Sequence, residues 1–202
     1  HEYISRAIGM GARAIVYDNQ ESIENQRHAI LEEGIALIKV ESSRKALAQI
    51  ASNFYGNPSE KLTLVGITGT NGKTTTKELT SRVLAEKFNV YATRGNLNNH
   101  IGVPLTLFRI NSETQAAVIE MGASNPGEIA TLVKLVCPSF GLITNVGKAH
   151  LLGFGSFEGV MQTKGELYDY LRRTADKTFL NVDNPYLCRM ASEREMHQDS
   201  ER

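Results

Sequence analysis

The residues most able to do chemistry lie in a glycine-rich loop, Gly69–Thr75, with the sequence GTNGKTT. A short apolar run precedes it and a helical pattern follows it, which is the context that makes such a match meaningful. Glycines let backbone N–H groups turn towards phosphate oxygens, and the first turn of a helix adds partial positive charge. Lys73 is placed to reach the β- and γ-phosphates of a nucleotide, and the Thr74 hydroxyl to coordinate Mg²⁺. Ile67 stands where the common phosphate loop has its first glycine, so this loop begins at Gly69 and is shorter.

Two side chains that follow apolar strands are candidates for a metal or catalytic site. Glu120 ends the strand 117–120, and a carboxylate at the carboxyl end of a strand, beside a phosphate loop, is well placed for Mg²⁺. An ordinary edge glutamate is the competing interpretation. His150 follows another strand, where a lone histidine is more often structural or solvated than a ligand. Spacing leaves both alternatives open for each residue.

Two further features are weaker when the residues are considered alone. Lys164 lies in the middle of a predicted helix, where a lysine usually faces solvent, so spacing gives it no role. Asn96, Asn98 and Asn99 form an amide-rich loop after a strand. Such side chains bind ligand carbonyls and hydroxyls, but they are also common in ordinary turns.

The elements that position these residues alternate along the chain. Strands rich in apolar residues are followed by helical spacing, which predicts an α/β fold with a mostly parallel sheet flanked by helices. Ligands of such sheets bind at the carboxyl ends of the strands, where the candidates lie. We expect strands at 12–17, 35–40, 62–67, 89–92, 115–121, 140–146 and 178–182, and helices at 2–10, 43–55, 74–87, 127–136 and 157–172.

Composition restricts the class of protein. The 202 residues carry 22 basic and 22 acidic side chains, so the formal net charge is zero and no basic run indicates nucleic acid binding. No apolar stretch approaches the roughly 20 residues of a membrane-spanning helix. Cys137 and Cys188 show no metal-binding spacing, and we interpret them as two reduced thiols of a cytosolic protein. A turn cluster at 56–59 predicts a boundary between a partial amino-terminal domain, 1–57, and a second domain, 58–202.

Taken together, these motifs resemble the Mur ligase family of ATP-dependent amide ligases, which build the peptide of bacterial peptidoglycan. The resemblance covers nearly the whole chain. It rests on the phosphate loop and on four further segments: 95–104 (GNLNNHIGVP), 118–123 (VIEMGA), 145–151 (NVGKAHL), and 153–156 (GFGS) followed by 164–166 (KGE).

The resemblance implies a P-loop-type central ATPase domain and a role for each candidate residue. Lys73, Lys164 and His150 are expected to be catalytic, and Thr74, Glu120 and His150 to bind Mg²⁺. Lys164 is expected to be carbamylated, which turns a helix lysine into an anionic group of the metal site. The residues expected to bind ATP are Gly69, Thr70, Asn71, Gly72, Lys73, Thr74, Thr75 and Asn145, and those expected to bind the other substrate are Asn96, Asn98 and Asn99.

The family also implies three domains: one for the UDP-sugar, a central ATPase domain and a third that presents the amine. We expect this chain to contain part of the first and an incomplete second, to lack the third, and to be inactive by itself. We also expect a cytoplasmic monomer.

Two branches of the family compete for the assignment. The segment 95–107 (GNLNNHIGVPLTL) is similar to the branch that joins D-alanyl-D-alanine to a UDP-muramyl-tripeptide, and this is our main prediction. Residues 40–76 are more similar to the branch that adds lysine or diaminopimelate to a UDP-muramyl-dipeptide. A module that binds ATP without turnover is a third interpretation.

Overall fold

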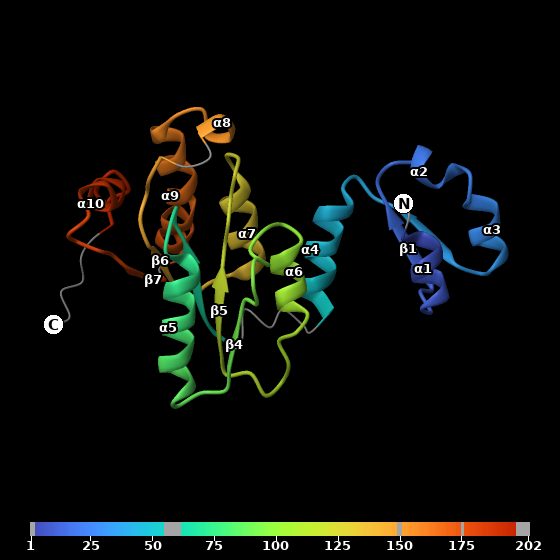
Figure 1. Ribbon diagram of the computed structural model, residues 1–202, viewed down its shortest axis with the longest axis horizontal. Helices are drawn as coiled ribbons and strands as arrows, with labels where there is room; N and C mark the ends of the chain where they lie inside the picture. Colours follow the sequence, from blue (N-terminus) through green and yellow to red (C-terminus); the bar gives the residue numbers. More distant parts are fainter. Residues whose placement is uncertain (1–2, 55–61, 149–150, 175, 197–202) are drawn as a thin grey trace. The chain divides into compact units, whose positions relative to one another are not determined.

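The computed structural model describes residues 3–54, 62–148, 151–174 and 176–196. The chain forms two compact units, His1–Ile50 and Ala51–Arg202 (Figure 1). The expected turn cluster at 56–59 lies outside the described residues.

The first unit is built on a two-stranded parallel sheet. Strands β1 (Ala14–Tyr17) and β2 (Ala36–Lys39) pair in register from Ala14 opposite Ala36 to Tyr17 opposite Lys39. Isoleucines make its core: Ile4, Ile23, Ile30 and Ile35. Its helices are α1 (Ile4–Gly9), α2 (Glu21–Glu24), α3 (Arg27–Glu32) and the start of α4 (Ser43–Phe54). The sequence analysis predicted α1 and α4 but missed α2 and α3, which are only four and six residues long.

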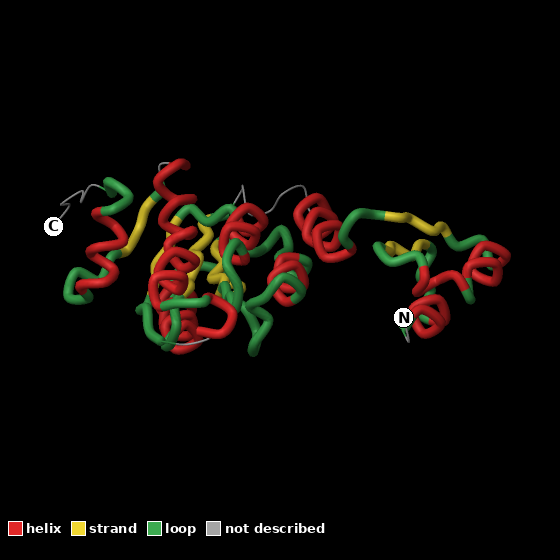
Figure 2. The backbone as a smooth tube through the Cα atoms, turned by 90° about the horizontal axis from the view of Figure 1, so that it is seen from above, coloured by secondary structure: helices red, strands yellow, loops and turns green. Residues whose placement is uncertain are grey.

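The second unit contains, in the described part of the chain, a five-stranded parallel sheet in the order β4-β5-β3-β6-β7. All five residues of β5 are buried, as expected of a parallel strand covered on both faces. In Figure 2 the strands of this unit lie among its helices. The strands are β3 (Thr63–Thr68), β4 (Val90–Ala92), β5 (Ala116–Glu120), β6 (Phe140–Ile143) and β7 (Lys177–Phe179).

The helices of this unit pack on the sheet in two groups. Helix α5 packs on β3, β4 and β5, while α6 and α9 each pack against α7, and all three contact the sheet. Right-handed crossovers place α5 on one face and the other three on the opposite face, because the chain moves along the sheet in opposite directions in the two cases. The helices are α5 (Lys73–Ala85), α6 (Gly102–Leu107), α7 (Glu128–Val136), α8 (Leu151–Phe154), α9 (Phe157–Thr174) and α10 (Pro185–Ser192).

Two sequence predictions for this unit need correction. Strand β6 ends at Ile143 rather than Val146, because Thr144 and Asn145 turn away to bond the phosphate loop. The last strand covers 177–179 rather than 178–182, and α6, α8 and α10 were not predicted. Cys137 and Cys188 are free thiols, as expected. No helix in the described ranges is long and apolar enough to cross a membrane.

Candidate functional site

The phosphate loop connects β3 to α5 and requires glycine at two points. Gly69 has φ +142° and Gly72 has φ +76°, conformations that side chains disfavour. A Cβ at Gly69 would also collide with the Thr144 hydroxyl. The loop is therefore a tight cradle whose shape depends on the absence of side chains at these positions.

The segment that follows β6 holds the phosphate loop in place through hydrogen bonds. The Asn145 amide bonds both backbone groups of Asn71: its Oδ1 accepts from the N–H at 3.0 Å and its Nδ2 donates to the carbonyl at 3.1 Å. The Asn145 carbonyl accepts from the N–H of Thr70 at 3.0 Å, and the Thr144 hydroxyl donates to the Asn71 carbonyl at 2.6 Å. Asn145 thus fixes the conformation of the loop by bonding backbone groups of the loop.

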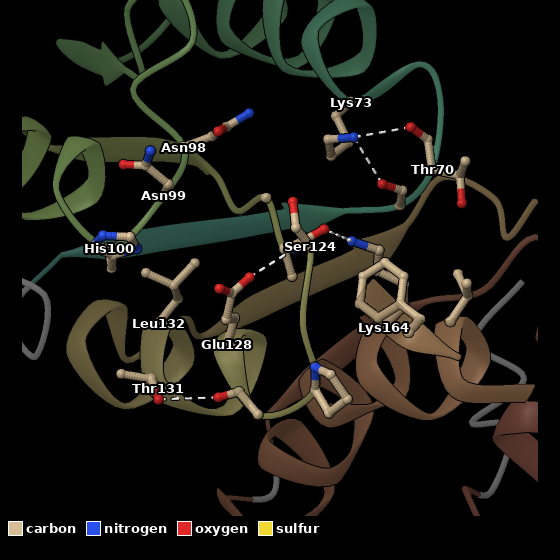
Figure 3. A pocket seen from close by; sticks show the side chains of 17 residues that line it. Thr70, Lys73, Asn98, Asn99, His100, Ser124, Glu128, Thr131, Leu132 and Lys164 are labelled. Atoms are coloured by element: carbon tan, nitrogen blue, oxygen red, sulfur yellow. Dashed lines mark hydrogen bonds between the residues drawn. The ribbon is translucent and has the colours of Figure 1, made fainter. Parts of the chain in front are cut away.

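These bonds determine which donors of the loop remain for phosphate. The N–H groups of Thr70 and Asn71 point to Asn145. The N–H groups that follow lie at the start of α5. In the first turn of a helix, N–H groups have no carbonyl one turn earlier to accept their hydrogen bonds, so these remain for a ligand. Lys73 places its ammonium over the loop, donating to the carbonyls of Gly69 at 2.8 Å and Thr70 at 3.0 Å (Figure 3). The arrangement concentrates positive charge where an anion would bind.

A buried carboxylate lies beside the loop at the end of β5. The Glu120 side chain accepts from the Thr74 hydroxyl at 2.9 Å through one oxygen, and from Asn98 Nδ2 at 2.8 Å through the other. Glu120 is only 2% exposed. The structure thus brings together a predicted phosphate-loop residue, a predicted metal ligand and a predicted substrate-binding residue from three separate segments.

Lys164 is buried, contrary to the expectation of a solvent-facing helix lysine. It lies on α9 with 3% exposure, because this face of α9 turns towards the cavity. Its ammonium donates to the Ala123 carbonyl at 3.4 Å and lies 5.5 Å from the centre of the Phe154 ring. The helical pattern identified the helix but not which of its faces is covered.

The pKa values of Lys73 and Lys164 are both lowered, but by different neighbouring charges. Burial lowers the pKa of Lys73, and the charge of Glu120 opposes the shift. Burial, and then the positive charge of Lys73, lower the pKa of Lys164 to about 8 against the opposing charges of Glu128 and Glu166. Lys164 is therefore partly neutral near physiological pH, which an exposed lysine is not.

Two carboxylates organise the wall of the site around the start of α7. Glu166 of α9 accepts from the N–H groups of Gly127 at 2.9 Å and Ala130 at 2.7 Å. Glu128 accepts from the N–H groups of Ser124 at 2.7 Å and Asn125 at 3.1 Å. Burial works against ionisation of Glu128, but these hydrogen bonds outweigh it and lower its pKa. Carboxylates at a helix N-terminus are also favoured by its dipole.

Some of these groups line a cavity of about 610 Å³, whereas Thr74, Glu120 and Glu166 are not among its lining residues (Figure 3). In Figure 3, Lys73 and Lys164 lie on the same side of the view, and Asn98, Asn99 and His100 of the amide-rich loop lie across from them. Its lining includes Gly69, Thr70, Lys73, Asn98, Asn99, His100, Gly122, Ser124, Glu128, Leu132, Phe154 and Lys164. The volume is suited to a small-molecule substrate site.

Not every predicted site residue reaches this cavity. Asn96 is exposed and is not part of the lining. Asn99 lines it, and its side-chain oxygen also accepts from the N–H groups of Ile101 and Gly102 at the start of α6. Thr75 is exposed on the first turn of α5. His150 lies outside the described residues, so its expected role stays a prediction.

The sequence analysis missed three residues that shape the site: Thr144, Glu128 and Glu166. A weak signal existed for Glu128, since an acidic residue in the first turn of a helix is typical of a dipole contact. Glu166 gave no such signal, because its partners lie 36 and 39 residues away on α7.

The comparisons with known proteins agree with this geometry. Residues 67–199 match the family described as the Mur ligase middle domain, and the chain belongs to the Mur ligase family. Several of the relatives that it matches are named as MurF ligases. The chain is 34% identical over 192 residues to the UDP-N-acetylmuramoyl-tripeptide–D-alanyl-D-alanine ligase of Bacillus subtilis, covering 93% of this chain and 40% of the relative.

Solved structures give the same result. A MurF crystal structure from Acinetobacter baumannii matches with a TM-score of 0.79 and 31% identity, covering 98% of this chain and 41% of that one. The Thermotoga maritima MurF ligase in complex with ADP matches with a TM-score of 0.64 and 29% identity, covering 85% and 48%. The chain thus spans about two fifths of the length of the curated relatives that it matches.

These matches also bear on the two competing branches. They extend over the amino-terminal residues, which the sequence analysis found more similar to the lysine- or diaminopimelate-adding branch. The comparisons do not favour that branch.

Proposed function

We propose that the protein containing this chain is an ATP-dependent ligase that joins D-alanyl-D-alanine to a UDP-N-acetylmuramoyl-tripeptide. The observation that carries the proposal is the hydrogen-bonded line Asn98–Glu120–Thr74, which connects the amide-rich loop typical of this branch to the phosphate loop. The reaction is assigned to the natural-length protein, by which we mean this chain together with any sequence that naturally precedes or follows it. ATP and a UDP-linked acceptor favour the cytoplasm, and we propose a monomer.

The residues of the loop fit ATP. The two positive-φ glycines form the cradle, the free N–H groups at the start of α5 and the Lys73 ammonium supply donors, and Asn145 holds the shape. Mg²⁺ fits the paired oxygens of Thr74 and Glu120, since hard oxygen ligands are those it prefers. When bound there, Mg²⁺ would neutralise charge on the phosphates. His150 completes the proposed set of metal ligands.

In the proposed reaction the terminal carboxylate of the UDP-muramyl-tripeptide attacks the γ-phosphorus of ATP. The bond to the bridging oxygen breaks, and an acyl phosphate and ADP form. The amine of D-alanyl-D-alanine then attacks the acyl carbon, loses a proton and expels phosphate, which leaves an amide.

The physical difficulty is bringing a carboxylate to a polyanion. Two unit charges 4 Å apart repel by about 4 kcal/mol at an effective dielectric constant near 20. Lys73 and the N–H groups at the start of α5 offset this repulsion and stabilise the charge on the phosphoryl group in transit.

Lys164 is proposed to be carbamylated. Its neutral amine attacks CO₂, forming an N–C bond and releasing a proton, and a pKa of about 8 leaves about a tenth of the amine neutral at pH 7. The carbamate would be an anion, so its interaction with Lys73 would change from repulsion to attraction. Burial and the Ala123 carbonyl hold the nitrogen at the cavity.

The test follows phosphate release by the natural-length protein with ATP and Mg²⁺. One mixture contains UDP-muramyl-tripeptide and D-alanyl-D-alanine, and the other UDP-muramyl-dipeptide with lysine or diaminopimelate. Release in the first mixture alone is expected. Release in the second alone would overturn the substrate assignment, and ATP binding without release in either would reduce the protein to a binding module.

A further inference from the structure

Lys77 is a buried lysine that the proposed reaction does not use. It lies on α5, one turn after Lys73, and is 1% exposed. Removing an ammonium group from water costs free energy unless it is paired and hydrogen-bonded, and an apolar side chain of similar length would fill the same space without that cost. Its partners therefore indicate what the charge does.

The Lys77 ammonium bonds two oxygens on different elements. It donates to the Thr93 carbonyl at 2.6 Å, just past the end of β4, and forms an ion pair with Glu78 at 2.8 Å. The Glu78 side chain is 55% exposed, and its pKa is lowered by the hydrogen bond and charge of Lys77. The contact that reaches into the protein is therefore the one with Thr93.

Thr93 passes this contact on to the end of β5. It is 2% exposed, and its N–H donates to the Val118 carbonyl at 3.0 Å. Its hydroxyl oxygen accepts from the N–H of Glu120 at 3.0 Å. The backbone of Glu120 is thus held by a residue that Lys77 holds in turn.

Helix α5 consequently holds Glu120 in two ways. The Thr74 hydroxyl bonds the carboxylate directly, and Lys77, three residues later on the helix, acts on its backbone through Thr93. Residues three apart lie on one face of a helix, so a shift of Glu120 against α5 would strain both connections.

We propose that Lys77 is a positioning residue which, through Thr93, sets the Glu120 carboxylate against the Thr74 hydroxyl for binding of the nucleotide-associated divalent cation. The inference rests on the proposed metal site of the ligase but not on the identity of its amine or acceptor. It concerns residues to which the sequence analysis gave no role.

The test measures ATP affinity by calorimetry for the natural-length protein, with and without Mg²⁺, in the absence of acceptor and amine. The readout is the factor by which Mg²⁺ tightens ATP binding. Lys77→Met should reduce that factor about tenfold while ATP affinity without Mg²⁺ changes little. Thr93→Val, which removes the hydroxyl, should act similarly, and Thr93→Ser should restore the factor.

A double variant tests whether Lys77 and Thr93 act on Glu120 through one connection, which we call the relay, or independently of each other. If Lys77 acts through Thr93, Lys77→Met with Thr93→Val should reduce the factor no more than the larger single change. Reductions that multiply would overturn the relay.

Two controls separate positioning from a loss of folding. Lys87→Met makes the same replacement at an exposed lysine and should leave both readouts unchanged. Leu187→Ala opens the core at α10, and should lower the thermal midpoint without changing the Mg²⁺ factor. A Lys77→Met protein with a lowered midpoint and an unchanged Mg²⁺ factor would show that Lys77 is structural only.

Failure of the positioning role of Lys77 can be distinguished from failure of the proposed ligase function. If neither substrate mixture releases phosphate but the Mg²⁺ factor still depends on Lys77 and Thr93, the ligase assignment fails and the positioning role stands. If the unchanged protein binds ATP equally with and without Mg²⁺, the positioning role is overturned whatever the mixtures release.

Discussion

The phosphate loop and the face of α9 each present a lysine to the same cavity, but they hold it in different ways. Lys73 is bonded to two carbonyls of its own loop, and Glu120 supports its charge. Lys164 is held by a carbonyl 41 residues away and by an aromatic ring, and burial and Lys73 lower its pKa to about 8. Burial lowers the pKa of both lysines, but the charge of Glu120 opposes the shift at Lys73, whereas the charge of Lys73 adds to it at Lys164. In the proposed reaction the two lysines carry opposite charges, Lys73 as an ammonium and Lys164 as a carbamate.

The largest effect is expected from removing the cation of the loop. Lys73→Ala in the natural-length protein should lower ADP formation at least about 10³-fold, which corresponds to about 4 kcal/mol of lost transition-state stabilisation. The thermal midpoint should stay within a few degrees, because Lys73 is only partly buried. Coupled-enzyme detection of ADP and a melting curve measure both, with Lys87→Ala as the exposed control. Retained turnover would contradict the assignment of the loop.

We expect that small anions can restore part of the activity lost on removing Lys164, but none of the activity lost on removing Lys73. Lys164→Ala should lower ADP formation about 10²-fold, and formate, acetate or high bicarbonate should restore part of it by supplying the missing anion. The same additives should do nothing for Lys73→Ala, because that variant lacks a cation. Rescue of both variants would remove the distinction between the two lysines, and full activity of Lys164→Ala would remove Lys164 from the site.

The cost of burying Lys164 gives a third test. A lysine whose pKa falls from 10.5 to about 8 costs on the order of 3 kcal/mol of folding free energy below pH 8, since burial disfavours its charged form. Between pH 8 and 10.5 the unfolded chain holds a proton that the folded chain has lost, so stability rises with pH across this window. In CO₂-free buffer Lys164→Met should therefore be more stable by about 2 kcal/mol at pH 7, allowing for the lost contacts with Ala123 and Phe154.

Denaturant titrations at pH 7 and pH 10.5 measure this difference. The advantage of Lys164→Met should be nearly absent at the higher pH. Bicarbonate at pH 8 should stabilise the unchanged protein and not the variant. An advantage that is independent of pH would indicate better apolar packing rather than relief of a buried charge.

The same contrast explains what could be predicted from the sequence. The phosphate loop is contiguous, so its glycines, lysine and threonines identified the site, and the alternation of strands and helices predicted the parallel sheet that presents it. Local spacing placed Lys164 on a helix but predicted a solvated face, because the contacts of α9 with the 123–128 segment are long-range in the sequence. Only the family resemblance indicated a role for it.

Short helices and supporting contacts were missed for related reasons. Helix α6 begins where the Asn99 side chain accepts two N–H bonds, a cap hidden within an amide-rich run that we interpreted as a ligand loop. Thr93 and Lys77 have no unusual spacing, and their connection to Glu120 exists only after β4, β5 and α5 have packed together.

The smallest expected effect concerns Glu166, which joins α9 to the N-terminus of α7. Glu166→Gln keeps one acceptor oxygen but loses the second bond and the charge near the helix dipole, so stability should fall by about 1 kcal/mol. The charge of Glu166 also raises the pKa of Lys164, so its removal should lower that pKa further. With ¹³C-labelled bicarbonate, the carbamate signal at pH 7 should therefore increase in the variant. Glu113→Gln, the same change at an exposed turn residue, should alter neither quantity. A weaker carbamate signal in Glu166→Gln would mean that Glu166 acts by holding the 123–128 wall in place for Lys164, and that its charge is secondary.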